Sequence, residues 1–243
     1  MKYLFTFSLL LVFVIGYGQK EKDPTATEIW DPKPEIVTPG ASMVEPPSDA
    51  IVLFDGSSLD SWTHMDGSPV KWKLEDGAMT VVKSTGDIKT RESFEDVQLH
   101  VEWCTPAEVS SKDQGRGNSG VWLQERYEVQ ILDSYNNQTY VNGQAGSIYK
   151  QHPPLVNACK GPGEWQSYDI IYQAPRFNEK GRLLIPARVT VLHNGVLIQN
   201  HIEIWGPVEY RGLPQYKKHG PASIRLQDHG NPVSFRNIWV RRL

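Results

Sequence analysis

The chain has 243 residues, and its 25 Lys and Arg against 28 Asp and Glu give a formal net charge of −3. Both signs are interspersed, so the chain lacks the basic footprint of a nucleic-acid-binding protein, and we expect no nucleic-acid partner. A hydrophobic content of 39% supports a packed core, while 20 Gly, 17 Pro and 8 Trp favour turns and aromatic strands over a helical bundle.

An apolar run follows Met1-Lys2 and continues to residue 15, before Gly18-Gln19 and an abrupt change to charged residues. This pattern is typical of a secretory signal peptide. Its roughly 13 apolar residues are too few to span a bilayer, which needs about 20. No cysteine stands at the junction to carry a lipid. We therefore predict that residues 1–18 are a cleaved signal peptide, that the chain has no membrane span, and that the mature protein is periplasmic or extracellular.

Residues 19–49 form a polar, proline-rich stretch without helical or strand periodicity. Such a composition is typical of an extended leader. We expect a single domain over residues 50–243. Its two cysteines, Cys104 and Cys159, can pair in an oxidising compartment or remain separate buried thiols, and the sequence leaves both readings open.

Within the expected domain, short β-rich runs alternate with turn signals, and no segment has a sustained helical repeat. The expected strands are 51–54, 72–74, 78–82, 97–103, 120–124, 127–132, 167–172, 188–192, 196–198, 223–227 and 234–240. The strongest hairpin signal is His193-Asn194-Gly195, because Asn-Gly readily adopts a type I′ turn. About eleven antiparallel strands predict an all-β fold, a jelly-roll β-sandwich of two antiparallel sheets.

Side chains alternate between the two faces of a strand, so each expected strand can be sorted into an apolar and a polar face. Four strands have polar faces that are rich in large planar groups: His100 and Glu102, Trp122 and Gln124, Glu128 and Gln130, and Arg225 and Gln227. Planar polar groups bind sugar hydroxyls, and an indole stacks on a pyranose ring. We therefore predict that these side chains share one concave carbohydrate-binding surface, the alternative being an ordinary solvated face.

Two loops are expected to border this surface. The first, residues 115–120, is rich in glycine, which lets the backbone approach a ligand closely. No helix pattern follows it, which argues against a phosphate-binding loop. The second loop follows the strand 127–132 and extends to residue 154. Together the two loops add four candidate binding residues: Arg116, Asn118, Asp133 and Tyr149.

The strand 127–133 contains the pattern E-x-Q-x-x-D, formed by Glu128, Gln130 and Asp133. It resembles the E-x-D-x-x-E strand of laminarinase-type glucanases, but here an amide replaces the central acid. Retaining hydrolysis needs two carboxyl groups about 5–5.5 Å apart with opposed roles. The replacement therefore weakens the interpretation as a conventional laminarinase-like glycoside hydrolase.

A larger set of sequence blocks runs in order from residue 51 towards the C-terminus. The blocks are Ile51–Gly56 with Leu59 and Trp62, Glu102-Trp103, Gly117–Val121, Tyr127–Asp133, Gly146–Tyr149, Gly163–Trp165, His193–Gly195, Ile224–Gly230 and Phe235–Ile238. In these blocks the chain resembles the 3-keto-disaccharide hydrolase family, and its leader is similar to that of secreted Bacteroidetes-type members. The resemblance implies a concanavalin A-like jelly roll that acts on 3-keto-glycosides, so a carbohydrate is the expected partner.

A ketone at C3 acidifies the proton at C2, so a base can remove it, the C1 substituent can leave by β-elimination, and water can then add. This chemistry needs a general base, a stabiliser for the enolate oxygen and an acid for the leaving group. The candidate bases are Glu128, His152 and His229. His152 is next to two prolines in a stiff loop, although a loop histidine is often a bystander, and His229 can equally be an exposed turn residue.

Arg225, Gln227 and Asn118 are the candidate stabilisers of the enolate. A divalent metal ion is an alternative stabiliser, but the sequence has no tight metal-ligand spacing and predicts no cofactor with certainty. The function is thus expected to be cleavage of 3-keto-glycosides by elimination and hydration. A non-catalytic carbohydrate-binding module remains the second interpretation.

Overall fold

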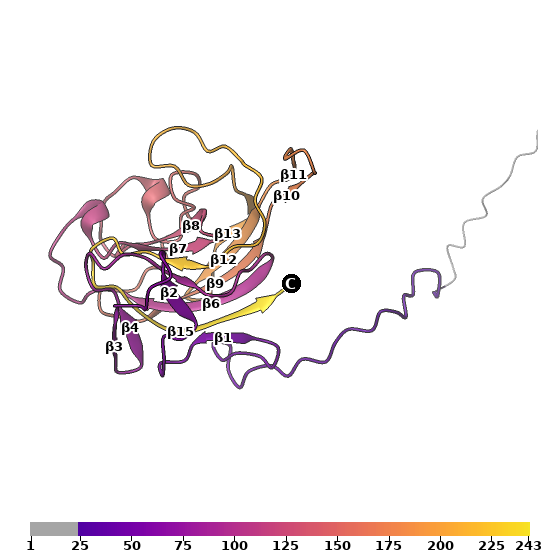
Figure 1. Ribbon diagram of the computed structural model, residues 1–243, viewed down its shortest axis with the longest axis horizontal. Coiled ribbons are helices and arrows are strands. Elements are labelled where there is room, and N and C mark those ends of the chain that lie inside the picture. Colours follow the sequence, from indigo (N-terminus) through magenta and orange to yellow (C-terminus); the bar gives the residue numbers. More distant parts are fainter. Residues whose placement is uncertain (1–23) are drawn as a thin grey trace, which may run out of the picture. The chain divides into compact units, whose positions relative to one another are not determined.

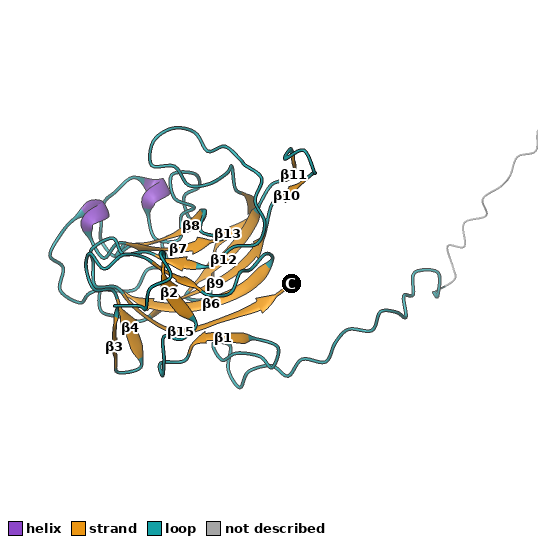
Figure 2. Cartoon of the chain, in the orientation of Figure 1, coloured by secondary structure: helices purple, strands orange, loops and turns teal. Residues whose placement is uncertain are grey.

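The computed structural model describes residues 24–243 and divides them between two units, one ending at Ile36 and one spanning Val37–Leu243. Figure 1 shows the ribbon, and Figure 2 shows that strands and loops account for nearly all of it. Residues 24–36 contain no helix or strand. The predicted signal peptide and residues 19–23 of the predicted leader lie outside the described residues. Between residues 24 and 243, no helix has the length and apolarity to cross a bilayer.

The larger sheet has eight antiparallel strands, in the order β13-β12-β9-β6-β15-β4-β3, and β1 also pairs with β15. Figure 1 shows β12, β9, β6 and β15 side by side. Its strands are β1 (Ile51–Phe54), β3 (Lys73–Glu75), β4 (Ala78–Thr80), β6 (Val97–Cys104), β9 (Gln166–Gln173), β12 (Arg188–His193), β13 (Val196–Glu203) and β15 (Ser234–Arg242).

The smaller sheet has five antiparallel strands, in the order β2-β5-β14-β7-β8. They are β2 (Trp62–His64), β5 (Ile88–Thr90), β14 (Arg225–Leu226), β7 (Ser119–Leu123) and β8 (Tyr127–Ile131). A separate two-stranded ribbon joins β10 (Arg176–Phe177) and β11 (Leu183–Ile185). Within residues 24–243 the only helices are two 3₁₀ turns, η1 (Asp113–Gly115) and η2 (Val141–Gly143), drawn in purple in Figure 2.

The core consists of the apolar faces of both sheets, as the alternation of side chains predicts. Val97, Leu99, Val101 and Trp103 supply it from β6, and Val121, Leu123, Val129 and Ile131 supply it from β7 and β8. These side chains are no more than 1% exposed. Burying so many branched and aromatic groups provides the main stabilisation of the fold, at about 25 cal/mol per Å² of apolar surface. The predicted all-β jelly roll of two antiparallel sheets is confirmed.

The predicted hairpin at residues 193–195 is present between β12 and β13. Asn194 and Gly195 have φ angles of +52° and +78°, which a type I′ turn requires at both central positions. A glycine and an asparagine meet this demand with little strain. Local turn chemistry therefore sets the register of this edge of the larger sheet.

Residues 37–49 belong to the same compact unit as the two sheets. The carbonyl oxygen of Val44 accepts hydrogen bonds from Trp239 Nε1 at 3.0 Å and from Asn237 Nδ2 at 2.9 Å. Asp49 forms an ion pair with Arg241. The end of the proline-rich stretch is thus attached to β15, on the outer face of the larger sheet.

Candidate active site

A cavity of about 280 Å³ lies on the outer face of the smaller sheet. Its walls come from β7, β8, the end of β14 and two loops. The lining residues are Asn118, Trp122, Glu128, Gln130, Tyr149, Val208, Tyr210, Gln227 and His229. A cavity lined by a few convergent polar groups and aromatic rings is the usual form of a small-molecule site.

Strand register explains why several of these side chains meet. Lys89 in β5 is opposite Arg225 in β14, Arg225 is opposite Trp122 in β7, and Trp122 is opposite Glu128 in β8. Directly opposite residues in antiparallel strands project from the same face, with Cβ atoms about 4.5–5.5 Å apart. The row therefore brings two cations, an indole and a carboxylate together across four strands.

The row continues beyond β8 through residues 146–149. Ile148 forms a β-bridge with Val129, and the backbone N–H of Tyr149 donates to the carbonyl oxygen of Glu128 at 3.2 Å. This segment therefore lies against the free edge of β8 like a short extra strand. It places Tyr149 opposite Glu128, on the same face, and both side chains line the cavity.

Glu128 supplies the carboxyl group of the cavity lining, and its pKa is strongly shifted. Its side chain is buried, and burial raises its pKa to about 8, against a smaller lowering effect of the Arg225 charge. Nearby Asp87 raises the pKa further. A carboxyl group with such a pKa exchanges protons readily near neutral pH, which suits a general acid or base.

Gly120 makes the space that Glu128 occupies. A Cβ atom at position 120 would lie 2.3 Å from Glu128 Oε1 and 2.9 Å from Trp122 Nε1. The first distance is well below van der Waals contact, so any side chain there would displace the carboxyl group. Glycine at this position thus leaves the space that the carboxylate occupies.

Gln130 contacts Glu128 from the same strand. With its amide nitrogen turned towards the carboxyl group, Gln130 donates to Glu128 Oε1 at 3.2 Å and to the carbonyl oxygen of Ser119 at 3.1 Å. The amide that replaces the central acid of the glucanase pattern therefore acts as a neutral neighbour of Glu128. It adds no second negative charge beside the carboxyl group.

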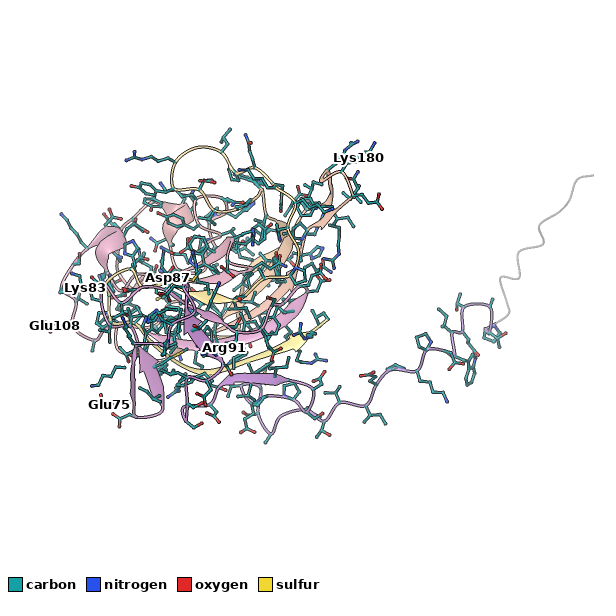
Figure 3. All side chains as sticks on the ribbon, in the orientation of Figure 1. Glu75, Lys83, Asp87, Arg91, Glu108 and Lys180 are labelled. Atoms are coloured by element: carbon teal, nitrogen blue, oxygen red, sulfur yellow. The ribbon has the colours of Figure 1, made fainter. Side chains whose placement is uncertain are left out.

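Arg225 supports the cavity from behind Trp122. Its guanidinium carbon lies 3.7 Å from the centre of the Trp122 ring, a cation–π contact, and its Nε is 3.5 Å from Asp87 Oδ2. Asp87, labelled in Figure 3, is half-buried, and burial raises its pKa, although a backbone hydrogen bond from Asp228 and the Arg225 charge act in the opposite direction. The guanidinium thus orients the indole and lends positive potential to the site.

Two polar atoms in the cavity wall have no hydrogen-bond partner among residues 24–243. Trp122 Nε1 is a buried donor, and Gln227 Oε1 is a buried acceptor. Buried polar atoms are nearly always hydrogen-bonded, because an unmade hydrogen bond costs about 1–3 kcal/mol. A ligand that carries both hydroxyl and carbonyl groups would satisfy both of them.

Val208 and Tyr210 complete the cavity from the long loop that follows β13, and sequence reasoning missed both. The backbone N–H of Val208 donates to the carbonyl oxygen of Arg126 at 2.8 Å, which attaches the loop to the β7–β8 turn. Gln151 is hydrogen-bonded on both sides of its amide, to the carbonyl oxygen of Gly206 and the N–H of Trp205. The loop has no periodic pattern, and its aromatic residues among Gly and Pro were the only signal available.

The sequence also matches the 3-keto-alpha-glucoside-1,2-lyase-like domain over residues 49–241. The chain belongs to this family. The resemblance found in the sequence blocks is therefore confirmed. A 3-keto-disaccharide hydrolase of Bacteroides thetaiotaomicron is 28% identical to this family member, and the match covers 79% of this chain and 78% of that protein.

Two crystal structures from Parabacteroides distasonis, both described as candidate glycosyl hydrolases, resemble this lyase-like domain. One is 51% identical with a TM-score of 0.87, covering 91% of this chain and 97% of that one. The other is 22% identical with a TM-score of 0.59, covering 80% of this chain and 94% of that one, and shows likeness of fold alone. Family and relatives together indicate a carbohydrate-active protein.

His100 and Glu102 do not share the surface with Glu128, and this prediction is wrong. Both lie on β6 in the larger sheet, and both point to its outer face. His100 Nδ1 is 2.7 Å from Asp169 Oδ1, and its ring stacks on Trp239 at 5.3 Å. Alternation sorted the faces of β6 correctly but could not tell to which sheet the strand belongs.

Gln124 is also absent from the cavity. It follows the end of β7 and has a φ angle of +49°, so it starts the turn instead of continuing the strand. Its Nε2 donates to the carbonyl oxygen of Phe94 at 3.1 Å, and its Oε1 accepts from Tyr172 at 2.8 Å. The side chain is therefore used inside the protein, because strand alternation does not continue through a turn.

Arg116 and Asp133 lie on a separate, smaller cavity of about 190 Å³. Arg116 Nε donates to Asp133 Oδ2 at 2.6 Å, and the pair connects the glycine-rich loop to the end of β8. They therefore do not border the Glu128 cavity, contrary to the expectation for both loops. Asn118, in the same loop, does line it, with its Nδ2 held by the carbonyl oxygen of Gln114 at 2.7 Å.

His152 does not line the Glu128 cavity either. Its Nε2 donates to the carbonyl oxygen of Glu203 at 2.9 Å, and its ring packs edge-on against Trp205 at 4.6 Å. This histidine supports the base of the loop that carries Tyr210. His229, in contrast, is exposed and lies at the cavity.

Residues 24–243 contain no cluster of three or more His, Cys, Asp or Glu side chains arranged to hold a metal ion. The donor set around the cavity therefore does not fit a protein-bound divalent ion, and we derive no step through one. Cys104 and Cys159 are both free thiols.

Proposed function

We propose that this protein cleaves 3-keto-glycosides by removing the proton at C2, eliminating the substituent at C1 and hydrating the product. One observation carries the proposal: within the described chain, Glu128 is the single carboxylate that lines the cavity. The family description and the name of the Bacteroides thetaiotaomicron relative both point to 3-keto sugars. They support the same substrate class.

Conventional glycoside hydrolysis needs two carboxyl groups that flank the glycosidic bond, about 5–5.5 Å apart for retention and about 6.5–9.5 Å for inversion. Glu128 has Gln130, Trp122 and Tyr149 as its neighbours on the face that lines the cavity. Asp133 is paired with Arg116 at the other cavity, and Asp87 lies behind Trp122 with Arg225. The second carboxyl group required for displacement at C1 is therefore missing from the lining.

Elimination needs only one strong base at the sugar ring, and Glu128 has the properties of one. Its deprotonated form takes the C2 proton, and the electron pair of that bond forms an enolate with the C3 ketone. A pKa of about 8 makes this carboxylate a stronger base than an exposed glutamate. The base is then matched to neutral solution, where positioned proton transfer contributes about 10²–10⁴ in rate.

The enolate then collapses, expelling the C1 oxygen and leaving a double bond between C1 and C2. Hydrogen-bond donors directed at the C3 oxygen would stabilise the enolate. The unpaired N–H of Trp122 is available for this purpose, with the Arg225 charge behind its ring. Addition of water at C1 and return of a proton to C2 complete net hydrolysis.

The test compares a 3-keto-disaccharide with its unoxidised parent, monitored by product chromatography. We expect cleavage of the keto form alone. Cleavage of the parent sugar would indicate a conventional glycosidase, and binding without cleavage of either sugar would indicate a carbohydrate-binding module.

A second measurement follows deuterium in D₂O. Hydration is expected to place solvent deuterium at C2 of the released sugar, because the C2–H bond is broken and the proton on the base exchanges with solvent before the bond is remade. Product without deuterium at C2, after correction for spontaneous exchange beside the ketone, would rule out elimination.

We also propose that the protein acts in the periplasm or outside the cell, after cleavage behind Gly18. The support is the short apolar run followed by a polar, proline-rich stretch. Mass spectrometry of the exported protein tests it, with an expected N-terminus at Gln19. A retained N-terminal segment would contradict the proposal.

A further inference from the structure

Tyr149 occupies a position in the cavity that the mechanism above leaves unused. Its backbone pairs with that of Glu128 at the edge of β8, so the two side chains project from the same face on neighbouring chain segments. Both line the cavity. The proton leaves C2 and the glycosidic oxygen leaves the adjacent C1, so a base and an acid at neighbouring positions can reach one sugar ring together.

The hydroxyl group of Tyr149 is hydrogen-bonded to the hydroxyl group of Tyr140 at 2.6 Å. Either oxygen can be the donor in this pair. When Tyr140 donates, the Tyr149 proton is free to point into the cavity, while its oxygen is already stabilised by one donor. Burial raises the pKa of Tyr149, so its hydroxyl group is protonated throughout the neutral range.

A cation lies beside this pair. The ammonium group of Lys150 is 4.5 Å from the centre of the Tyr140 ring, 5.1 Å from that of Tyr210 and 6.0 Å from that of Tyr149. A positive charge this close to two hydrogen-bonded phenols favours a transient phenolate. The three tyrosines and the lysine thus form a donor cluster on the side of the cavity where the lone buried carboxylate lies.

On the basis of the proposed function, we propose that Tyr149 is the general acid that protonates the departing glycosidic oxygen and, as phenolate, the base that activates water in the hydration step. In the first half, Glu128 gains the C2 proton, the C1–O bond breaks, and the released oxygen takes the phenolic proton of Tyr149. In the second half, Tyr149 recovers a proton from water, the hydroxide adds to C1, and Glu128, whose proton has meanwhile exchanged with solvent, delivers a proton to C2. Protons and electrons balance without a further reactant. Tyr140 and Lys150 are positioning residues that stabilise the phenolate.

The decisive experiment varies the leaving group. A 3-keto-glucoside of p-nitrophenol releases an anion that departs without protonation, whereas the methyl 3-keto-glucoside or a 3-keto-disaccharide releases a poor leaving group that needs an acid. We expect Tyr149→Phe to lower kcat/KM for the disaccharide by about 10²–10⁴, the usual contribution of a positioned proton donor. Release of p-nitrophenolate, corrected for the spontaneous rate, is expected to fall less than about threefold, on the scale of a lost hydrogen bond.

The p-nitrophenyl substrate also shows that the variant is folded and that its base still works. Tyr140→Phe is expected to lower disaccharide cleavage by about tenfold, as one hydrogen bond to an anionic oxygen would. Tyr135→Phe makes the same chemical change on an exposed side chain outside the cavity, and we expect no effect on either substrate.

Equal losses of Tyr149→Phe on both substrates would show that the residue only binds the sugar, and this result would overturn the proposal. The acid would instead be His229 if His229→Asn lowered cleavage of the disaccharide far more than release of p-nitrophenolate and Tyr149→Phe did not. This result would also overturn the proposal. Neither outcome changes the selectivity for keto sugars or the deuterium result. The general-acid assignment can therefore fail while the proposed function stands.

Discussion

The outer faces of the two sheets each bury a glutamate, and the two residues have opposite properties. On the larger sheet, burial would raise the pKa of Glu102, but hydrogen bonds from Asn237 and Arg236 lower it below its usual value. On the smaller sheet, Glu128 has no ion pair within 4 Å in the part of the chain that the structure describes, and burial raises its pKa to about 8. Both side chains point to the outer face of their sheet, so the neighbours decide whether a buried carboxyl group is structural or reactive.

The largest expected difference between these faces is in activity. Glu128→Gln should lower turnover of a 3-keto-disaccharide by about 10²–10⁴, because it removes a positioned base and keeps the shape of the side chain. Glu102→Gln is the matched control on the other sheet, and we expect its kcat to stay within about twofold of wild type. Steady-state kinetics and sugar binding by calorimetry measure both. Comparable losses in the two variants would show that the cavity is not the reaction site.

The space beside Glu128 offers a second way to test the comparison. Gly120→Ala places a Cβ atom within 2.3 Å of the Glu128 carboxyl oxygen in the present arrangement, so the carboxyl group must move. A displacement of about 1 Å costs on the order of 10² in rate, and overpacking costs about 1–3 kcal/mol in stability.

Gly220→Ala is the control for this experiment, because its added Cβ atom would meet no neighbour within 4 Å. Kinetics together with thermal unfolding separate the two effects of Gly120→Ala. Full activity of the Gly120→Ala variant would mean that catalysis tolerates displacement of Glu128, and this result would weaken the role of Glu128 as the base.

The smallest expected effect is on stability as a function of pH. The folded pKa of Glu128 lies above its unfolded value of 4.5, so the folded state binds more protons between pH 4.5 and about 8. The contribution of Glu128 to the free energy of unfolding is therefore complete below pH 4.5 and is lost as pH rises through 8. The pH dependence of the stabilisation by Glu102 is the reverse, since this stabilisation is present at neutral pH and is lost on acidification.

Differential scanning calorimetry at pH 5 and pH 8.5 tests this difference. Glu128→Gln should raise Tm at pH 8.5 by about 3–10 °C, corresponding to roughly 1–3 kcal/mol, with little change at pH 5. Glu102→Gln should lower Tm at pH 8.5. A stabilisation of the Glu128 variant that is the same at both pH values would contradict the raised pKa.

The same two faces show how far the sequence alone reaches. Alternation along β6, β7 and β8 identified the buried and the polar side of each strand, since that property is local. Sheet membership is not local: His100 and Trp122 have the same kind of environment in the sequence, yet they lie on different sheets. Assigning strands to sheets needs the long-range pairing of β6 with β9 and β15, which no short pattern records.

Parts of the cavity built from loops were the hardest to predict. Tyr149 was identified from its block, but its partner Tyr140 and the neighbouring Lys150 were not, because their meeting depends on η2 and a backbone turn at Lys150 with a φ angle of +62°. Tyr210 comes from a segment without regular structure that is held by Gln151 and Arg126. Such contacts arise from tertiary packing, so sequence periodicity carries no signal for them.

The attachment of residues 37–49 to β15 has a practical consequence for cutting this protein into fragments. A fragment that starts at residue 50, the boundary predicted from the sequence, lacks the Val44 carbonyl and the Asp49 carboxylate. Trp239, now 3% exposed, would lose the acceptor of its indole N–H, and Arg241 would lose its partner. The proline-rich stretch therefore contributes its last 13 residues to the folded unit, and a fragment that begins at or before Val37 keeps all of these contacts.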